Sequence, residues 1–231
     1  MESKKIIAII PARSGSKSLR NKNIKKLVKK PLLAWSIETC LKSKLISKIF
    51  LSTDSKKYAK IAKSFGPIEI LLRPKIICGD LSTDYQMILH AIKNIKYDYD
   101  YIAHIRPTTP IRKISDIDLA IKKFVNSKYA SLRSVHEMSE TSYKTLEINN
   151  KGLLKSLKNL NFSIDELNKP RQKFNKTYVP NGVIDIYNKN FVIKNKILFG
   201  NNVKAFKTSY AHEIDSKEDF NYIEYLCKKK L

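Results

Sequence analysis

An apolar run ending at Ile10 lies near the start of the chain and leads directly into a polar, basic loop. A continuous apolar stretch of this kind is typical of a strand buried on both faces of a sheet, because a half-exposed strand would alternate. Strands buried on both faces occur mainly where helices cover both sides of a parallel sheet. The start of the chain therefore predicts an α/β fold.

The segments that follow alternate between the two periodicities. Apolar residues recur at helical spacing in three internal segments and one terminal segment, at about 33–41, 88–95, 117–124 and 220–227. Short strand-like runs fall at 49–52, 68–72, 101–105 and 183–187. Strands that alternate with helices form βαβ units and a mostly parallel sheet. We expect the active site at the carboxyl ends of these strands, where the polar loops lie.

The alternation breaks between about residues 130 and 181. Tyr143 to Ile148 resembles a strand, residues 149–152 a turn, and residues 168–178 an irregular polar segment. We interpret this stretch as a small lobe inserted into a single domain that spans residues 1–231.

The net charge of the 231-residue chain is +24. A nucleic-acid-binding protein would use such a charge to displace counterions from phosphates. The basic runs, such as Lys25-Lys26 and Lys29-Lys30, are separated, however, and no nucleic-acid-binding motif accompanies them. The pattern favours lysines spread over solvated faces, which also attract anionic substrates, and no nucleic-acid partner.

Three widely spaced cysteines, at positions 40, 78 and 227, form no CxxC pair. This usage favours reduced thiols and a cytoplasmic protein. No stretch of about 18 apolar residues is present, so no membrane association is expected.

The loop after the first strand, residues 11–23, combines small residues with several cationic side chains. Backbone N–H groups near Gly15 and Ser16 are able to cradle phosphates. Arg13, Lys17 and Lys22 are suited to neutralise a triphosphate and the charge that develops as a phosphoryl group is displaced. The loop is neither a Walker A nor a GxGxxG sequence. The alternative is an ordinary solvated basic loop.

Two acidic residues, Glu213 and Asp215, precede the terminal helix. Alternation by two would place both carboxylates on one side, where they are able to hold Mg²⁺ beside substrate phosphates. The other interpretation is a helix cap at Asp215-Ser216 with Glu218 as the capping-box partner. Both interpretations are compatible with one another.

A series of short motifs runs through nearly the whole chain. In order, they are Ile9-Ile10-Pro11-Ala12-Arg13-Ser14-Gly15-Ser16-Lys17, Lys22-Asn23, Arg73-Pro74, Asp80, Arg106-Pro107-Thr108-Thr109-Pro110-Ile111-Arg112, Tyr143-Lys144, Pro170-Arg171-Gln172, Pro180-Asn181-Gly182, and Glu213-Ile214-Asp215 followed by Glu218-Asp219-Phe220. Together these motifs resemble the acylneuraminate cytidylyltransferases, also called CMP-sialic acid synthetases.

The resemblance implies a Rossmann-like nucleotidyltransferase fold with a mostly parallel sheet and a small inserted dimerisation lobe. It implies a homodimer in which this lobe reaches across to the partner. The implied reaction transfers CMP from CTP to a nonulosonate sugar acid. The anomeric hydroxyl attacks the α-phosphate, pyrophosphate leaves, and Mg²⁺ is the cofactor.

The resemblance also implies a role for each matching residue. Nucleotide binding falls to Ala12, Arg13, Ser14, Gly15, Ser16, Lys17, Lys22, Asn23, Arg73, Asp80 and Thr83. Sugar binding falls to Arg106, Thr108, Thr109, Lys144, Arg171 and Asn181. Glu213 and Asp215 would ligate Mg²⁺, and the catalytic residues would be Arg13, Lys22 and Asp215.

The chain departs from the family pattern at several of these positions. Ser14 stands where glycine is frequent, Glu213 where aspartate is usual, and Arg106 where N-acetylneuraminate enzymes have glutamine. An extra cation at Arg106, together with the stretch 134–138, favours the bacterial branch that uses legionaminic acid or a related nonulosonate. The alternatives are a cytidylyltransferase for another acid such as 3-deoxy-manno-octulosonate and, more remotely, a basic nucleic-acid-binding protein.

Overall fold

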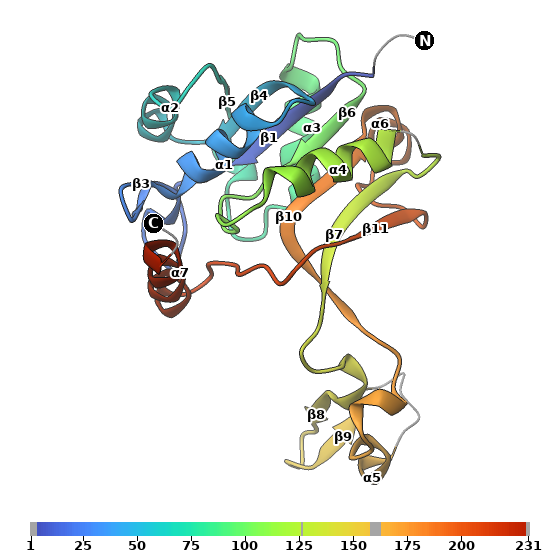
Figure 1. Ribbon diagram of the computed structural model, residues 1–231. Helices are drawn as coiled ribbons and strands as arrows, with labels where there is room; N and C mark the ends of the chain where they lie inside the picture. The colour runs from blue at the N-terminus through green and yellow to red at the C-terminus, as the bar shows by residue number, and fades with distance from the viewer. Residues whose placement is uncertain (1–3, 126, 158–162, 230–231) are drawn as a thin grey trace.

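The computed structural model of the chain describes residues 4–125, 127–157 and 163–229. Its centre is a seven-stranded sheet (Figure 1). In spatial order the strands are β11 (Val203–Lys207), β7 (Ser131–Glu137), β10 (Tyr178–Asn188), β6 (Tyr101–His104), β1 (Ile6–Pro11), β4 (Ile46–Thr53) and β5 (Glu69–Leu72). Neighbouring strands are parallel except at β10, which is antiparallel to both β6 and β7. The predicted α/β fold with a mostly parallel sheet is confirmed.

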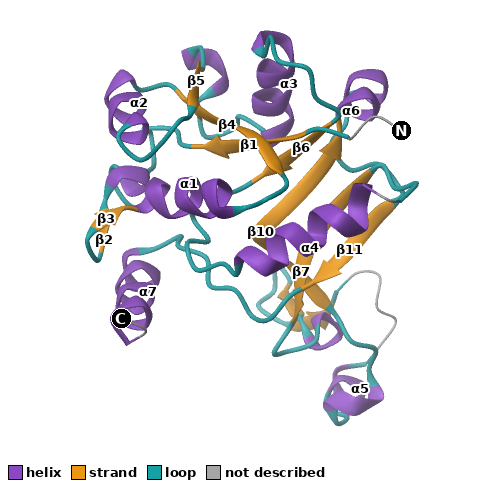
Figure 2. Ribbon diagram, turned by 45° about the horizontal axis from the view of Figure 1, so that its top comes forward, coloured by secondary structure: helices purple, strands orange, loops and turns teal. Residues whose placement is uncertain are grey.

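Helices cover both faces of this sheet (Figure 2). On one face lie α1 (Leu32–Lys42), α2 (Lys56–Lys63) and α4 (Ile114–Val125), and on the other lie α3 (Asp84–Asn94) and α6 (Lys189–Asn195). Successive residues of β1 serve the two faces in turn, because side chains alternate along a strand. Ile6, Ala8 and Ile10 pack into the α1 side, and Ile7 and Ile9 into the α3 side. The first strand is therefore buried on both faces, as its apolar run predicted.

The terminal helix α7 (Lys217–Lys229) packs away from the sheet, against a short hairpin. The hairpin strands are β2 (Lys26–Leu27) and β3 (Lys30–Pro31), and the 3-10 turn η1 (Lys22–Ile24) precedes them. Ile214 lies in the same apolar cluster as Phe220 of α7. This contact anchors the segment that carries the two predicted metal ligands.

The inserted lobe stands at the end of a stem made by β7 and β10 (Figure 1). It contains β8 (Leu146–Ile148), β9 (Leu154–Ser156) and α5 (Ile164–Leu167), with the 3-10 turns η3 (Ser142–Lys144) and η4 (Arg171–Lys173). The strand expected from Tyr143 begins only at Leu146, because the preceding residues form η3. Residues 131–137 and 178–181, at the margins of the expected lobe, belong to strands β7 and β10.

The carboxyl ends of four adjacent strands, β6, β1, β4 and β5, meet along one edge of the sheet. Each of these strands is followed by a polar loop. The 3-10 turn η2 (Lys75–Ile77) lies in the loop after β5. Within the described part of the chain, no helix has the length and apolar character needed to cross a membrane.

Candidate active site

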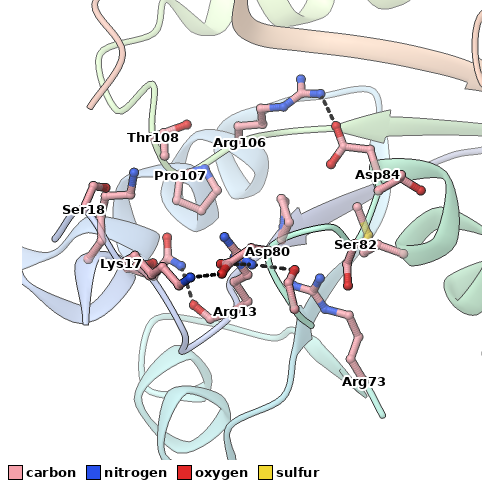
Figure 3. A pocket seen from close by; sticks show the side chains of 17 residues that line it. Arg13, Lys17, Ser18, Arg73, Asp80, Ser82, Asp84, Arg106, Pro107 and Thr108 are labelled. Carbon is pink, nitrogen blue, oxygen red and sulfur yellow. Dashed lines mark hydrogen bonds and ion pairs between the residues drawn. The ribbon is translucent and has the colours of Figure 1, made fainter. Parts of the chain in front are cut away.

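A cavity of about 460 Å³ opens at the carboxyl ends of these strands (Figure 3). This volume lies within the usual range for small-molecule sites. Its walls come from the loops that follow β1, β5 and β6 and from the start of α3. The lining includes Pro11, Arg13, Ser16, Lys17, Ser18, Lys22, Asn23, Arg73, Gly79, Asp80, Ser82, Thr83, Asp84, Met87, Arg106, Pro107 and Thr108. Many residues predicted from distant parts of the sequence thus share one cavity.

The loop after β1 is held in shape by two side chains. The carboxylate of Asp54, at the end of β4, accepts hydrogen bonds from the Ser14 amide at 2.8 Å and from the Ser14 hydroxyl at 2.7 Å. The Asn23 amide donates to the Arg13 carbonyl at 3.0 Å. Ser14 therefore uses its N–H inside the protein, whereas a Cβ placed on Gly15 would meet open space. Of the two N–H groups predicted to cradle phosphates, that of Ser16 donates to the Ser14 carbonyl at 3.0 Å, which leaves the Gly15 N–H for a phosphate.

Burial of Asp54 by itself would raise its pKa, but the hydrogen bonds from Ser14 outweigh that effect and the pKa is lowered. Asp54 is therefore ionised at neutral pH and makes charge-assisted bonds, which are stronger than neutral ones. The next residue, Ser55, is the N-cap of α2, and its hydroxyl accepts from the Tyr58 amide.

Arg13 and Lys17 both contact a carboxylate inside the cavity. Arg13 Nη1 lies 3.4 Å from Asp80 Oδ1, and Lys17 Nζ lies 2.5 Å from Asp80 Oδ2. Arg13 Nη1 also donates to the carbonyl of Gly79 at 2.7 Å. The two predicted phosphate ligands are thus gathered around an acidic residue that was expected to bind the nucleotide.

Lys22 joins the first loop to the segment before α7. Its ammonium group donates to the Ile214 carbonyl at 2.8 Å and lies 3.5 Å from Asp215 Oδ1. The residue is buried, whereas the side chain of Asp215 is 76% exposed. The predicted catalytic cation and the predicted metal ligand, distant in the sequence, are therefore neighbours in the fold.

Glu213 is held against the loop after β6. Its Oε1 accepts from the Thr108 hydroxyl at 2.8 Å, and the Ile214 amide donates to the Thr108 carbonyl at 2.8 Å. No strand forms here, yet the expected alternation is present, because Ile214 is buried between two exposed carboxylates. Glu213 and Asp215 thus flank the residue that anchors them.

The cap of α7 differs from the expected one. The Ser216 hydroxyl accepts from the Asp219 amide at 3.1 Å, and Asp219 Oδ2 accepts from the Ser216 amide at 2.8 Å. The capping box predicted with Asp215 and Glu218 is therefore wrong by one residue. The carboxylate of Asp215 takes no part in this cap.

A row of aromatic rings in tilted and edge-to-face contact supports the segment that leads to Glu213. His136 of β7, Tyr210, His212 and Tyr222 of α7 follow one another with ring centroids 4.5, 4.7 and 5.1 Å apart. Contacts of this kind stabilise by a fraction of a kcal/mol to about 1.5 kcal/mol each. They tie an irregular segment to both the sheet and the terminal helix.

Arg106 does not stand in the cavity as an extra free cation. Its Nη1 donates to Asp185 Oδ2 at 2.6 Å, and its Nη2 donates to Asp84 Oδ2 at 2.7 Å. Its side chain is 17% exposed, and that of Asp185 is 1% exposed. Burial alone would lower the pKa of Arg106, but attraction to Asp185, Tyr187 and Asp84 raises it. The charge that favoured a distinct sugar is largely matched within the protein.

A buried histidine extends this polar network beneath the cavity. His104 Nδ1 lies 3.2 Å from the Tyr187 hydroxyl, which donates to Asp185 Oδ2 at 3.4 Å. Burial lowers the pKa of His104 to about 3, so its ring is neutral. Its Nε2 has no hydrogen-bond partner among the described residues.

Arg73 and Thr83 line the cavity, but both are engaged in local structure. Arg73 Nη2 donates to the Ser52 carbonyl at 3.0 Å, and burial lowers its pKa. The Thr83 hydroxyl accepts from the Gln86 amide and caps α3. Arg73 and Thr83 therefore stabilise the backbone around the cavity, and both side chains also line it.

Four of the predicted sugar-binding residues lie outside the cavity. Thr109 is buried and donates to the Asn181 carbonyl, and the Asn181 amide donates to the Thr208 hydroxyl at 2.8 Å. Lys144 and Arg171 belong to the lobe. There Lys144 lies over the Phe174 ring, and Arg171 donates to Glu137 at 3.0 Å.

The carboxylates of Glu213 and Asp215 fit the requirements of Mg²⁺. This ion keeps several waters and is held through one or two carboxylates together with substrate phosphates. The exposed Asp215 carboxylate borders the cavity through Lys22, and Glu213 borders it through Thr108. Across the described ranges, no group of three or more His, Cys, Asp or Glu side chains is arranged to hold a metal.

The fold and the site together define a class of protein. Helices on both faces of a mostly parallel sheet, with a cation-rich cavity at the carboxyl ends of its strands, make a nucleotide-binding α/β protein of the Rossmann-like type. The family model described as cytidylyltransferase matches residues 7–231. The chain belongs to the cytidylyltransferase family and is therefore a nucleotidyltransferase.

Curated relatives match almost the whole chain. An N-acylneuraminate cytidylyltransferase from Escherichia coli is 36% identical over 98% of this chain and 53% of its own length. A CMP-N,N'-diacetyllegionaminic acid synthase from Campylobacter jejuni is 30% identical over 97% of this chain and 96% of its own. The post-translational flagellin modification protein B of Campylobacter coli has the same identity and coverage. The chain thus spans about half the length of the first relative and nearly all of the other two.

Solved structures support the same fold. CMP:2-keto-3-deoxy-manno-octonic acid synthetase complexed with CTP superposes with a TM-score of 0.74 over 99% of this chain and 100% of that one. The sequence identity is 15%, so this likeness concerns the fold alone.

Proposed function

We propose that the chain transfers CMP from CTP to the anomeric hydroxyl of a nonulosonate such as N-acetylneuraminate, legionaminate or a relative. One observation carries the proposal. Arg13, Lys17 and Lys22 converge on a single cavity that is bordered by Glu213 and Asp215. Cations beside a pair of carboxylates are what phosphoryl transfer with a divalent ion requires. The names of the relatives supply the nucleotide and the class of sugar acid.

In the proposed reaction the anomeric hydroxyl gives up its proton to solvent, its oxygen bonds to the α-phosphorus of CTP, and the bond from that phosphorus to the bridging oxygen breaks, so that pyrophosphate leaves. Arg13 and Lys17 bind the phosphates, and Lys22 stabilises the charge that grows on them. Mg²⁺, held by Asp215 and Glu213, would neutralise the phosphates and lower the pKa of the attacking hydroxyl. The Asp54–Ser14 contact keeps the loop in place, so little reorganisation is needed during the reaction.

We further propose a homodimer in which the lobe of one protomer completes the sugar site of the other. Lys144 and Arg171 lie in a lobe that stands away from the sheet of its own chain (Figure 1). Exposed apolar residues on the lobe, among them Ile148, Leu153 and Leu154, support an interface there. A cytoplasmic location stays a prediction from the cysteine usage.

The reaction is tested by pyrophosphate release with Mg²⁺, comparing CTP with ATP, GTP and UTP. The acceptor panel contains N-acetylneuraminate, legionaminate, pseudaminate and 3-deoxy-manno-octulosonate. We expect release with CTP and one nonulosonate, and its loss in Arg13→Ala. Turnover with 3-deoxy-manno-octulosonate alone would instead favour a cytidylyltransferase for that sugar acid. If folded protein released no pyrophosphate with any acceptor of the panel, the proposal would be refuted.

The shared site is tested by mixing two inactive variants. Arg13→Ala removes the phosphate site, and Arg171→Ala removes the lobe's contribution. Mixed dimers would contain one site with both residues intact, so activity should return on mixing. No recovery in a mixture that is shown to contain heterodimers would place the whole site within one chain.

A further inference from the structure

Asp80 is an anion placed among the cations assigned to the triphosphate. Figure 3 shows it between Arg13 and Lys17, with dashed lines to both. Lys17 Nζ is in direct contact with it at 2.5 Å, and Arg13 Nη1 lies at 3.4 Å. The protein itself therefore supplies the counter-ion for both cations.

A bound triphosphate and this carboxylate compete for the same partners. A phosphate oxygen that takes the Lys17 ammonium needs the position that Asp80 Oδ2 holds. A carboxylate that stayed beside the phosphates would repel them, because like charges a few ångströms apart disfavour one another. The hydrogen bond from Lys17 holds the pKa of Asp80 below its usual value, so the side chain is charged at neutral pH.

The loop that carries Asp80 is able to move at a low cost in free energy. It connects β5 to α3, and two of its apolar residues are left in solvent, with Ile76 86% and Leu81 96% exposed. A loop that buries so little apolar surface opens at low cost. Arg13 Nη1 donates to the carbonyls of Cys78 and Gly79 in the same loop. Movement of the loop would therefore also break the hydrogen bonds that hold the Arg13 guanidinium.

We propose that Asp80 is a placeholder anion for the phosphate site. Before the nucleotide binds, the Asp80 carboxylate holds Arg13 and Lys17 close to one another. Its ion pairs with both cations break when the phosphates bind, and they form again as pyrophosphate leaves. It thereby weakens the binding of pyrophosphate and speeds its exit. The inference rests on the proposed function, since it takes the ligand of these cations to be a triphosphate.

The test measures binding of pyrophosphate and of CTP by calorimetry, with no acceptor sugar present. Asp80→Asn keeps the shape of the side chain and removes its charge. We expect pyrophosphate to bind about two- to fivefold more tightly than to the wild type, which is the range for loss of an exposed competing ion pair. The gain should be smaller in a Lys17→Met background, because one of the two competing contacts is already gone.

Glu69→Gln is the matched control. It removes the same charge from another exposed ion pair, with Lys48 at 2.6 Å, at the side of the sheet away from the cavity. We expect its affinity for pyrophosphate to equal that of the wild type. A gain of equal size in this control would mean that net charge alone is responsible, and the placeholder role would be overturned.

Unchanged or weaker pyrophosphate binding in Asp80→Asn would also overturn the proposal, since it would make Asp80 a support for Arg13. Asp80→Ser provides a second variant in case asparagine keeps a hydrogen bond to Lys17. The proposed function fails separately, in the turnover assay. If Asp80→Asn bound pyrophosphate more tightly but the wild type showed no turnover with any acceptor, the placeholder role of Asp80 would stand and the proposed CMP transfer would be refuted.

Discussion

Arg106 and Asp185 form a buried ion pair. Neutralising either residue alone should lower the free energy of unfolding more than neutralising both together. Arg106→Gln introduces the residue common in the N-acetylneuraminate enzymes. The substitution leaves Asp185, whose side chain is 1% exposed, without the guanidinium that lies 2.6 Å away. Arg133 Nε, at 3.7 Å, is too distant to replace it fully. Breaking such a pair from one side costs about 3–5 kcal/mol. For a chain of this size, the cost corresponds to a fall in Tm of roughly 6–20 °C.

The double variant Arg106→Gln, Asp185→Asn should recover most of this loss, because neither buried charge remains. Urea unfolding of the wild type, both single variants and the double variant gives the coupling energy directly, and we expect at least about 1.5 kcal/mol. The control is Lys48→Gln, which breaks an exposed pair and should cost about 1 kcal/mol or less. Additive effects, or a single variant Arg106→Gln within about 1 kcal/mol of the wild type, would refute the reasoning.

Three further predictions concern the surroundings of the cavity. The pKa of His104 is lowered to about 3 by burial, so the unfolded chain binds its proton first as pH falls below about 6.5. Stability should therefore drop by about 2 kcal/mol between pH 6.5 and 5, and His104→Gln should flatten that slope in urea titrations. Asp54→Asn should lower the rate of pyrophosphate release by about 10- to 100-fold, whereas Ser14→Gly, which keeps the backbone bond, should lower it less; equal losses would argue against the loop-holding role. Gly182→Ala places a Cβ 2.6 Å from Thr109 Oγ1 at φ +65°, so Tm should fall by roughly 2–8 °C, and an unchanged melting curve would contradict this.

The parts of the fold that were predictable are those governed by local periodicity. Helices α1, α3 and α4 and strand β1 each bury a face that the apolar spacing already marks. Strands β7 and β11 were not recognised, because charged and polar residues interrupt their apolar pattern. The antiparallel entry of β10 between β6 and β7 depends on pairing across the inserted lobe, which no local pattern encodes.

The site was predictable where a loop follows a recognised strand. Arg13, Lys17 and Lys22 were expected to act together, and the structure brings them to one cavity. Asp54 and Asp185 were missed as site residues because each has its effect through a partner distant in the sequence. A signal for Asp54 was nevertheless present, since it follows strand β4, and the carboxyl ends of neighbouring parallel strands meet.

The distribution of acidic residues explains why net charge alone says little about this protein. Only 21 acidic residues accompany 45 basic ones, yet six of the 21 line or border the cavity. They are Asp54, Asp80, Asp84, Asp185, Glu213 and Asp215. A surface that binds nucleic acid would gain from unopposed lysines and arginines. A site that must bind a triphosphate, orient it and release pyrophosphate gains instead from cations held at fixed positions by nearby carboxylates. These six acids lie where the basic groups are needed for chemistry, and the excess positive charge lies elsewhere.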